Sequence, residues 1–246
     1  MDIKNKVVLI TGSSSGIGKA TAIRFAEEGA KIVINYHINE KGGKETLNEI
    51  KKITPDVVLV KADVSKTEDV DNLFKETIDK FGTIDILINN AGIGTDKVPF
   101  MEAKHEDLSE MINTNLVGPM ICSQKAIKIM EKQGFGKILN TTSIRGSEHG
   151  GRAPVYAATK AALNSFTKTL SKQVAPHIQV NAVAPGFVKT RSYDNMTQEM
   201  VDGFINQTYL KRWVTVDEIA DAFVFLVKND AMTGQVIYVD AGFTLK

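Results

Sequence analysis

Short apolar runs alternate with longer amphipathic segments along most of the chain. The runs predict strands at Val7–Ile10, Lys31–Asn35, Val57–Val60, Asp85–Asn89, Lys137–Thr141, Ile178–Ala182 and Gln235–Val239. The longer segments have helical spacing and predict helices at Lys19–Glu28, Glu40–Lys52, Thr67–Lys80, Lys104–Asn113, Leu116–Lys132, Pro154–Val174 and Val216–Val227. Continuously apolar strands indicate a sheet covered on both faces. The pattern therefore predicts a three-layer, doubly wound parallel α/β sheet, in a single domain of residues 1–246.

The segment from Gly186 to about Thr215 departs from this alternation. It has no clear strand, mixes polar and apolar positions, and contains Phe187, Tyr193, Phe204, Tyr209 and Trp213. Aromatic residues in a long connection favour a flap over a cleft. The alternative is an ordinary extra helix on the surface, and the pattern does not separate the two.

Composition narrows the class of protein further. The chain has 43% hydrophobic and 24% charged residues and a net charge of +1, so no charge excess favours nucleic acid or an anionic membrane. The single Cys122, together with the absence of an apolar leader or of any run near 18 apolar residues, predicts a cytoplasmic protein. His37, His105 and His177 lack metal-ligand spacing, so no metal site is expected.

The first candidate site is the turn between the first strand and the first helix. Gly12, Gly16 and Gly18 stand in the stretch TGSSSGIG, a spacing different from the commoner G-x-G-x-x-G. In an open parallel sheet this position binds dinucleotides, because the helix N-terminus offers unpaired N–H groups to a pyrophosphate. Glycine lets the backbone approach the phosphates closely. The turn therefore predicts a dinucleotide cofactor.

The second candidate site is a Tyr-x-x-x-Lys pair with a nearby serine. Tyr156 and Lys160 are four residues apart in a predicted helix and share one of its faces, and Ser143 ends an apolar strand. A positive charge about 4 Å from a phenol contributes roughly 4 kcal/mol, enough to lower the phenol's pKa by about 3. Tyr156 is then suited to exchange a proton near neutral pH, and Ser143 to hydrogen-bond the substrate oxygen.

Taken together, these motifs resemble the short-chain dehydrogenase/reductase family, in its single-domain branch. The resemblance extends over essentially the whole chain. Its motifs occur in the family's order: Thr11 to Gly18, Asp63-Val64, Asn89 to Gly92, Asn115, Ser143, Tyr156 with Lys160, and Pro185 to Thr190. It implies an oxidoreductase that interconverts a ketone and a secondary alcohol.

The resemblance also implies a role for each matching residue. Tyr156 is the general acid/base, Ser143 orients the carbonyl, Lys160 binds the nicotinamide ribose, and Asn115 holds a relay water. Asp63 and Val64 meet the adenine, Asn90 the adenosine ribose, and Val188 and Thr190 the carboxamide. The turn and the resemblance together assign cofactor contacts to Gly12, Ser14, Ser15, Gly16, Ile17, Gly18, Asn35, His37, Asp63, Val64, Asn90, Ala91, Gly92, Tyr156, Lys160, Pro185, Gly186, Val188 and Thr190.

The residues after the second predicted strand bear on the choice of cofactor. An NAD enzyme usually has a carboxylate there, and this chain reads Asn35-Tyr36-His37. Ser15 replaces the cation that many NADP-preferring relatives carry in the turn, but His37 and the serine hydroxyls offer partial substitutes. NADP(H) is therefore favoured, with NAD(H) as the alternative.

Two types of relative are similar enough to suggest a substrate. A 3-oxoacyl-(acyl-carrier-protein) reductase is favoured over a glucose 1-dehydrogenase type. A catalytically silent nucleotide-binding sensor or scaffold is the alternative in which the chain is not an enzyme. The first would make acyl carrier protein a partner. Family members commonly form homotetramers through their two long central helices, and this is expected here. Whether the polar residues Arg145, Glu148, His149 and Arg152 touch substrate is not decided by the sequence.

Overall fold

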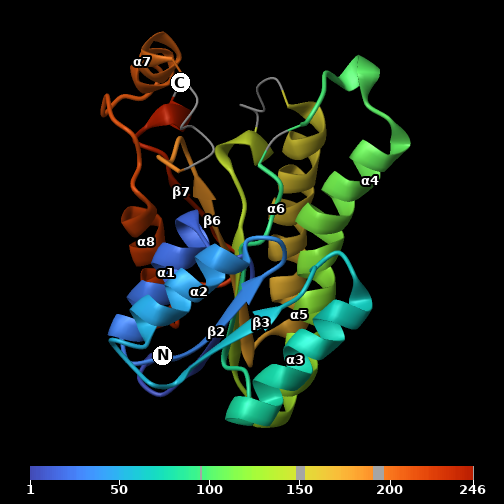
Figure 1. Ribbon diagram of the computed structural model, residues 1–246, viewed down its shortest axis with the longest axis vertical. Helices are drawn as coiled ribbons and strands as arrows, with labels where there is room; N and C mark the ends of the chain where they lie inside the picture. Colours follow the sequence, from blue (N-terminus) through green and yellow to red (C-terminus); the bar gives the residue numbers. More distant parts are fainter. Residues whose placement is uncertain (95, 148–152, 191–196, 246) are drawn as a thin grey trace.

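The computed structural model describes residues 1–94, 96–147, 153–190 and 197–245, and a seven-stranded parallel sheet forms its centre (Figure 1). The sheet order is β3-β2-β1-β4-β5-β6-β7. The strands are β1 (Val7–Ile10), β2 (Lys31–Tyr36), β3 (Val57–Lys61), β4 (Ile86–Asn89), β5 (Gly136–Thr141), β6 (Ile178–Pro185) and β7 (Val236–Val239). Every neighbouring pair of these strands is parallel, as the sequence predicted.

Helices cover both faces of the sheet (Figure 1). One face packs against α1 (Gly16–Glu27), α2 (Glu40–Ile50) and α8 (Val216–Lys228), and the other against α3 (Thr67–Phe81), α5 (Gly118–Gln133) and α6 (Pro154–Val174). Successive residues of β1 enter opposite cores, because side chains alternate along a strand: Val8 and Ile10 face α1, whereas Val7 and Leu9 face α3 and α5. The predicted three-layer arrangement is therefore confirmed.

The strand order places a crevice at the carboxyl ends of the central strands. β1 pairs with both β2 and β4. From β1 the chain builds the sheet through β2 to β3 at one edge, and then returns beside β1 and builds from β4 to β7 at the opposite edge. Open parallel sheets bind their ligands outside such a switch point. The turn at Gly12, the segment after β4 and the segment after β5 all meet there.

Two helical elements differ from the sequence-based expectation, and a third lies where the sequence left two possibilities open. α1 begins at Gly16 rather than at Lys19, because tertiary contacts override the poor helix propensity of glycine. A π-helical turn, η2 (Asn113–Val117), joins α4 (His105–Ile112) directly to α5. α7 (Gln198–Asn206) is a helix within the segment for which a flap and an extra helix were both open. Within the described ranges, no helix combines the length and hydropathy that a membrane span requires.

Candidate active site

The turn between β1 and α1 carries two glycines where a larger residue would not fit. Gly12 has a φ of +64°, and a Cβ atom there would lie 2.7 Å from the Cα atom of Ala91. A Cβ atom on Gly18 would lie 2.4 Å from the carbonyl oxygen of Gly12 and 2.5 Å from Nδ2 of Asn90. A Cβ atom on Gly16 would stay 3.7 Å from its nearest neighbour. Gly12 and Gly18 therefore make room for the protein's own backbone, which brings the turn against the segment after β4.

Side chains from the ends of β1, β2 and β4 hold this turn. Oδ1 of Asn35 accepts a hydrogen bond from the backbone N–H of Gly12 at 3.0 Å. Nδ2 of Asn90 donates to the carbonyl oxygens of Thr11 and Gly12 at 3.0 and 3.1 Å. Oγ1 of Thr11 accepts from the N–H groups of Asn90 and Ala91. The turn is thus preformed, and the Asn35 amide, assigned to the cofactor from sequence, bonds the turn itself.

The start of α1 leaves backbone donors for an anion. Ser15 is the N-cap residue, and its side chain makes no capping hydrogen bond to the helix. The first N–H groups of an α-helix have no partner within the helix and carry partial positive charge. The described turn therefore presents N–H groups at the position predicted for a pyrophosphate.

One half of the crevice, of about 540 Å3, runs from the turn across the ends of β2 and β3. At the far end, Nε2 of His37 lies 3.7 Å from Oδ2 of Asp63. Burial raises the pKa of Asp63, but hydrogen bonds from Ser65 and the nearby His37 ring bring it below its ordinary value. His37 therefore faces a carboxylate within the crevice. The lining includes Gly12, Ser14, Ser15, Gly16, Ile17, Gly18, Asn35, His37, Asp63, Val64, Asn90, Ala91 and Gly92.

The other half, of about 650 Å3, lies over the ends of β4, β5 and β6. Its lining includes Thr141, Ser143, Arg145, Tyr156, Lys160, Pro185, Gly186, Phe187, Val188, Thr190 and Phe204. Ile17, Asn90, Gly92, Ile93 and Thr190 line both halves, so the two form one continuous cleft. Every residue that the sequence assigned to cofactor or catalysis lines this cleft, except Asn115, which is fully buried.

Tyr156 and Lys160 lie one turn apart near the start of α6. Nζ of Lys160 donates to the carbonyl oxygen of Thr141 at 2.8 Å and lies 5.7 Å from the centroid of the Tyr156 ring. Burial lowers the pKa of Lys160 to about 8. Lys160 therefore carries its charge at neutral pH and loses it in mildly alkaline solution.

Ser143 is brought to this pair by the turn that follows β5. Its Oγ accepts a hydrogen bond from the backbone N–H of Arg145 at 3.1 Å, which starts the 3-10 turn η3 (Ile144–Gly146). A Cβ atom on Gly146 would lie 2.7 Å from the carbonyl carbon of Lys160. Glycine at position 146 thus lets η3 pack directly on the backbone of α6, beside the residue that carries the ammonium.

Asn115 lies in the π-helical turn η2 and supports the segment after β4. Its Oδ1 accepts from the backbone N–H of Ile93 at 2.7 Å, and its Nδ2 donates to the carbonyl oxygen of Ile93 at 2.9 Å. A Cβ atom on Gly92 would lie 3.1 Å from Oδ1 of Asn115 and 3.8 Å from Nζ of Lys160. The small residue at position 92 therefore lies between the Asn115 amide and the Lys160 ammonium.

Aromatic residues from separate segments pack together beside the cleft, and two of them, Phe187 and Phe204, line it. Phe187, after β6, lies 4.5 Å from Phe204 of α7 and 5.0 Å from Phe243, measured between ring centroids. Trp213 packs on the same group. Phe243 was not singled out from the sequence, since nothing near position 243 indicates a contact with residues that precede it by about 56 positions.

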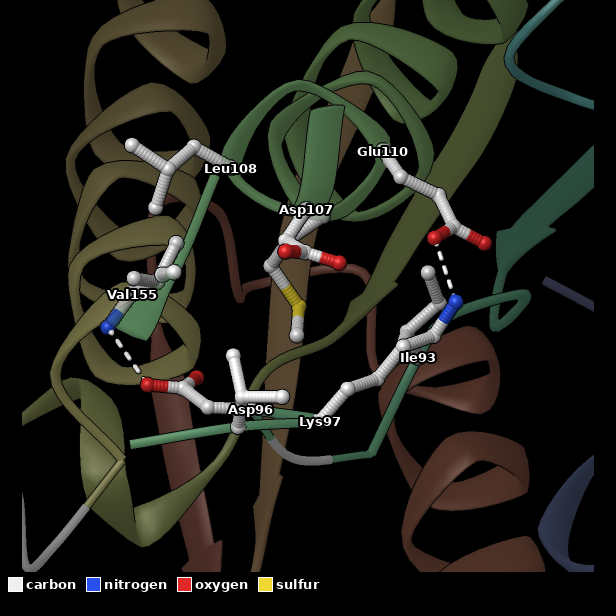
Figure 2. Close-up of a pocket in the computed structure, with 10 residues that line it drawn as sticks. Ile93, Asp96, Lys97, Asp107, Leu108, Glu110 and Val155 are labelled. Atoms are coloured by element: carbon white, nitrogen blue, oxygen red, sulfur yellow. Dashed lines mark hydrogen bonds and ion pairs between the residues drawn. The ribbon is translucent and has the colours of Figure 1, made fainter. Parts of the chain in front are cut away.

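Two charged residues of the cleft region were also missed. Asp96 and Lys97 follow β4, and both border a small cavity of about 20 Å3 beside α4 and the start of α6 (Figure 2). Nζ of Lys97 forms an ion pair with Glu110 of α4, and Asp96 reaches the backbone of α6. No local motif marks these positions, because their partners are distant in sequence.

Some of the polar residues near Ser143 lie outside the part of the chain that the structure describes. These are Glu148, His149 and Arg152, as is Tyr193 of the aromatic group. Arg145 is described and lines the half of the cleft over the ends of β4, β5 and β6. Within the described ranges, no group of three or more His, Cys, Asp and Glu side chains is placed to hold a metal ion.

Comparison with known proteins gives consistent relatives. A family model described as enoyl-(acyl carrier protein) reductase matches residues 12–244. A 3-oxoacyl-(acyl-carrier-protein) reductase of Synechocystis sp. is 38% identical over 244 residues, covering 98% of this chain and 97% of the relative. A reductase of the same name from Staphylococcus epidermidis is 36% identical over 241 residues, covering 97% of this chain and 98% of the relative.

Solved structures agree with these relatives. An actinorhodin polyketide ketoreductase variant with NADPH superimposes with a TM-score of 0.91 at 29% identity, covering 97% of each chain. A short-chain dehydrogenase/reductase variant from Serratia marcescens has a TM-score of 0.92 at 28% identity, covering 99% of this chain and 100% of the other. With the Ser143, Tyr156 and Lys160 side chains meeting in one cleft, the chain belongs to the short-chain dehydrogenase/reductase family of oxidoreductases.

Proposed function

We propose that the protein is an NADPH-dependent reductase of 3-oxoacyl thioesters. The observation that carries the proposal is the convergence of Ser143, Tyr156 and Lys160 on one half of a cleft whose other half has a preformed glycine-rich turn. The choice of substrate is supported by relatives at 36 to 38% identity that are named 3-oxoacyl-(acyl-carrier-protein) reductases.

The cleft fits a dinucleotide. Gly12 and Gly18 bring the turn against the end of β4, and the uncapped N–H groups at the start of α1 suit a pyrophosphate. His37, Asp63 and Val64 would hold the adenosine end. Residues that follow β6, including Val188 and Thr190, together with Lys160, would hold the nicotinamide end. When bound, the cofactor supplies a hydride.

The chain's own residues supply the proton and hold the carbonyl group. Tyr156 donates its phenolic proton to the substrate oxygen, and Ser143 hydrogen-bonds the same oxygen as negative charge develops on it. Lys160, positively charged at neutral pH, stabilises the phenolate that remains. The Asn115 side chain is bonded to the backbone of Ile93 and lies beside Gly92, next to Lys160, where this residue would support a water that returns a proton through Lys160.

The same proposal favours NADP(H) over NAD(H). β2 ends in Asn35-Tyr36, followed by His37, so no carboxylate stands at that strand end to accept from a ribose 2′-hydroxyl. Ser14 and His37 border the adenosine half of the cleft and offer donors to a 2′-phosphate. The Asp63 carboxylate beside His37 opposes this preference, which makes NAD(H) the alternative cofactor.

Acyl carrier protein is the acidic partner that this function would use. The exposed side chains of Lys128, Lys132 and Lys172, which the sequence offered as contacts for it, lie in the C-terminal turns of the long helices α5 and α6, next to the starts of β5 and β6 and away from the cleft. These helices are also the surfaces through which we propose that the chain forms a homotetramer. The buried and reduced Cys122 suits a cytoplasmic location.

A substrate panel tests the proposal directly. Acetoacetyl-CoA reduction is measured with NADPH and NADH, and glucose oxidation with NADP and NAD, each by the absorbance of the reduced nicotinamide. We expect turnover of acetoacetyl-CoA, with the lower KM for NADPH. Turnover of glucose alone would replace the proposal with a sugar dehydrogenase, and tight NADPH binding with no turnover would indicate a nucleotide-binding sensor or scaffold.

A further inference from the structure

The first turn of α6 carries Tyr156 and cannot cap itself. Ala153 precedes the helix and has no side chain that accepts a hydrogen bond. Pro154 is the first helical residue and has no N–H group. The N–H of Ala157 bonds the carbonyl oxygen of Ala153 at 2.9 Å. The two donors of this turn that still need a partner are therefore the N–H groups of Val155 and Tyr156.

One carboxylate from a distant segment accepts from both donors. Oδ2 of Asp96 accepts from the N–H of Val155 at 3.3 Å, and its Oδ1 accepts from the N–H of Tyr156 at 3.0 Å. Figure 2 shows the Asp96 carboxylate directed at the start of α6. Asp96 lies 60 residues before Tyr156, so this cap is supplied entirely by the fold.

Residues 90–94, shortly before Asp96 in the chain, lie at the cofactor half of the cleft. Asn90 and Gly92 line both halves, and Ile93 is held through its N–H and its carbonyl by the Asn115 side chain. The Asp96 cap therefore connects the floor of the predicted cofactor site to the backbone of the residue that would donate the proton.

We propose that Asp96 is a positioning residue for Tyr156, an inference that rests on the proposed reductase function. By bonding the N–H groups of Val155 and Tyr156, it holds the first turn of α6, and with it the phenol, in register with Ser143 and the substrate oxygen. A misplaced proton donor slows proton transfer, whereas the glycine-rich turn and the adenosine half of the cleft are left unchanged. A carboxylate suits this role because it has two acceptor oxygens and a charge that favours a helix N-terminus.

The test compares graded variants at one position. Asp96→Ala removes both acceptors, and Asp96→Asn keeps one. With acetoacetyl-CoA and NADPH, we expect kcat to fall roughly ten- to a hundredfold in Asp96→Ala and less in Asp96→Asn, because a small displacement of a reacting group is costly. The dissociation constant of NADPH, measured by fluorescence, should change less than about twofold, since the cap touches no adenosine or turn residue.

A solvent isotope effect separates positioning from general damage to the fold. Proton transfer from Tyr156 should become more rate-limiting, so the ratio of kcat in H2O to kcat in D2O should rise in Asp96→Ala. Asp107→Ala is the matched control: Asp107 borders the same cavity and accepts from the N–H of Lys104 at 3.0 Å, but it caps α4 and not α6. We expect Asp107→Ala to leave both kcat and the isotope effect close to the wild-type values.

Each outcome decides between the alternatives. If the wild type reduces the substrate and the kcat values of Asp96→Ala and Asp96→Asn lie within about twofold of the wild-type kcat, the positioning role is overturned and the reductase function stands. Equal losses of kcat and NADPH affinity with an unchanged isotope effect also overturn it. If Asp96→Ala does not fold, the kcat and isotope effect of Asp96→Asn decide. A wild type that reduces no 3-oxoacyl thioester overturns the proposed function, and this inference with it.

Discussion

At the scale of single residues, Lys160 combines two opposing requirements. Its proposed role needs a positive charge beside Tyr156, but it is only 5% exposed and its one described hydrogen bond is to a neutral carbonyl oxygen, that of Thr141. Burial disfavours the charged form and lowers its pKa from 10.5 to about 8. The site therefore holds a charge that costs folding free energy.

Replacing Lys160 should consequently stabilise the fold while abolishing activity. Between pH 8 and pH 10.5 the unfolded chain binds more protons at Lys160 than the folded chain does. The destabilisation that Lys160 causes is therefore greatest below pH 8 and decreases as the pH rises. We expect Lys160→Met to raise the free energy of unfolding by up to about 3 kcal/mol near pH 7, a gain that shrinks toward pH ~10. Urea unfolding at both pH values measures it, and an equal gain at both would contradict the explanation.

The phenol of Tyr156 gives the second residue-scale prediction. Tyr156→Phe removes the proton donor but keeps the ring, so we expect kcat to fall roughly 10²- to 10⁴-fold with little change in NADPH affinity. Stopped-flow and fluorescence titration provide the two measurements. Retained turnover would show that another group donates the proton.

His37 gives the third residue-scale prediction. His37→Asp would place a second carboxylate beside Asp63, at the position where NAD enzymes bind the ribose 2′-hydroxyl. The new carboxylate would repel the 2′-phosphate of NADPH, and like charges in contact cost several kcal/mol. The kcat/KM for NADPH should therefore fall relative to the kcat/KM for NADH by roughly tenfold or more. His37→Ala is the control for loss of the ring alone. An unchanged ratio would mean that the 2′-phosphate does not approach position 37.

At the scale of elements, the site depends on how η3 packs against α6. The Tyr156 and Lys160 pair follows from spacing within one helix, and Ser143 from its place at the end of an apolar strand. Their distance from one another depends on Gly146, whose missing Cβ lets the turn after Ser143 touch the backbone at Lys160. Sequence patterns describe each element alone, so this contact was not predictable.

Gly146→Ala tests that contact. The new Cβ would lie 2.7 Å from a backbone carbon of α6, which cannot yield as a flexible side chain can, so η3 must move and carry Ser143 with it. We expect kcat to fall at least about tenfold with a destabilisation of roughly 1–3 kcal/mol. Gly203→Ala in α7, where a Cβ would have nothing within 4 Å, is the matched control and should retain activity. Equal activity of the two variants would contradict the packing argument.

At the scale of the whole molecule, the surfaces of α5 and α6 bear on assembly. Apolar residues on these helices can serve either a subunit interface or the core of the monomer. Ala126, Met130 and Leu163 are buried within the monomer, whereas Ala161 of α6 is exposed. Ala161, together with the half-buried Ile121, Ile129, Ala157 and Phe166, is thus available to a second copy of the chain.

We expect size-exclusion chromatography with light scattering to give the mass of four chains. Ala161→Glu should shift that mass toward dimer or monomer, because an unpaired charge in an interface is costly to bury. Lys80→Glu on α3, an exposed charge change outside the proposed interface, should not alter it. A monomeric wild type would refute the tetramer.

The sequence by itself determined the sheet and predicted most of the candidate site. Continuous apolar strands bury both faces, which requires helices on each side, and the glycine turn, Tyr156 and Lys160 are local patterns set by strand ends and helical spacing. Tertiary structure alone decided the rest: the cap that Asp96 places on α6, the Phe243 contact with Phe187, and the lowered pKa of Lys160. These arise between segments far apart in the chain, where the folded backbone sets distance and burial.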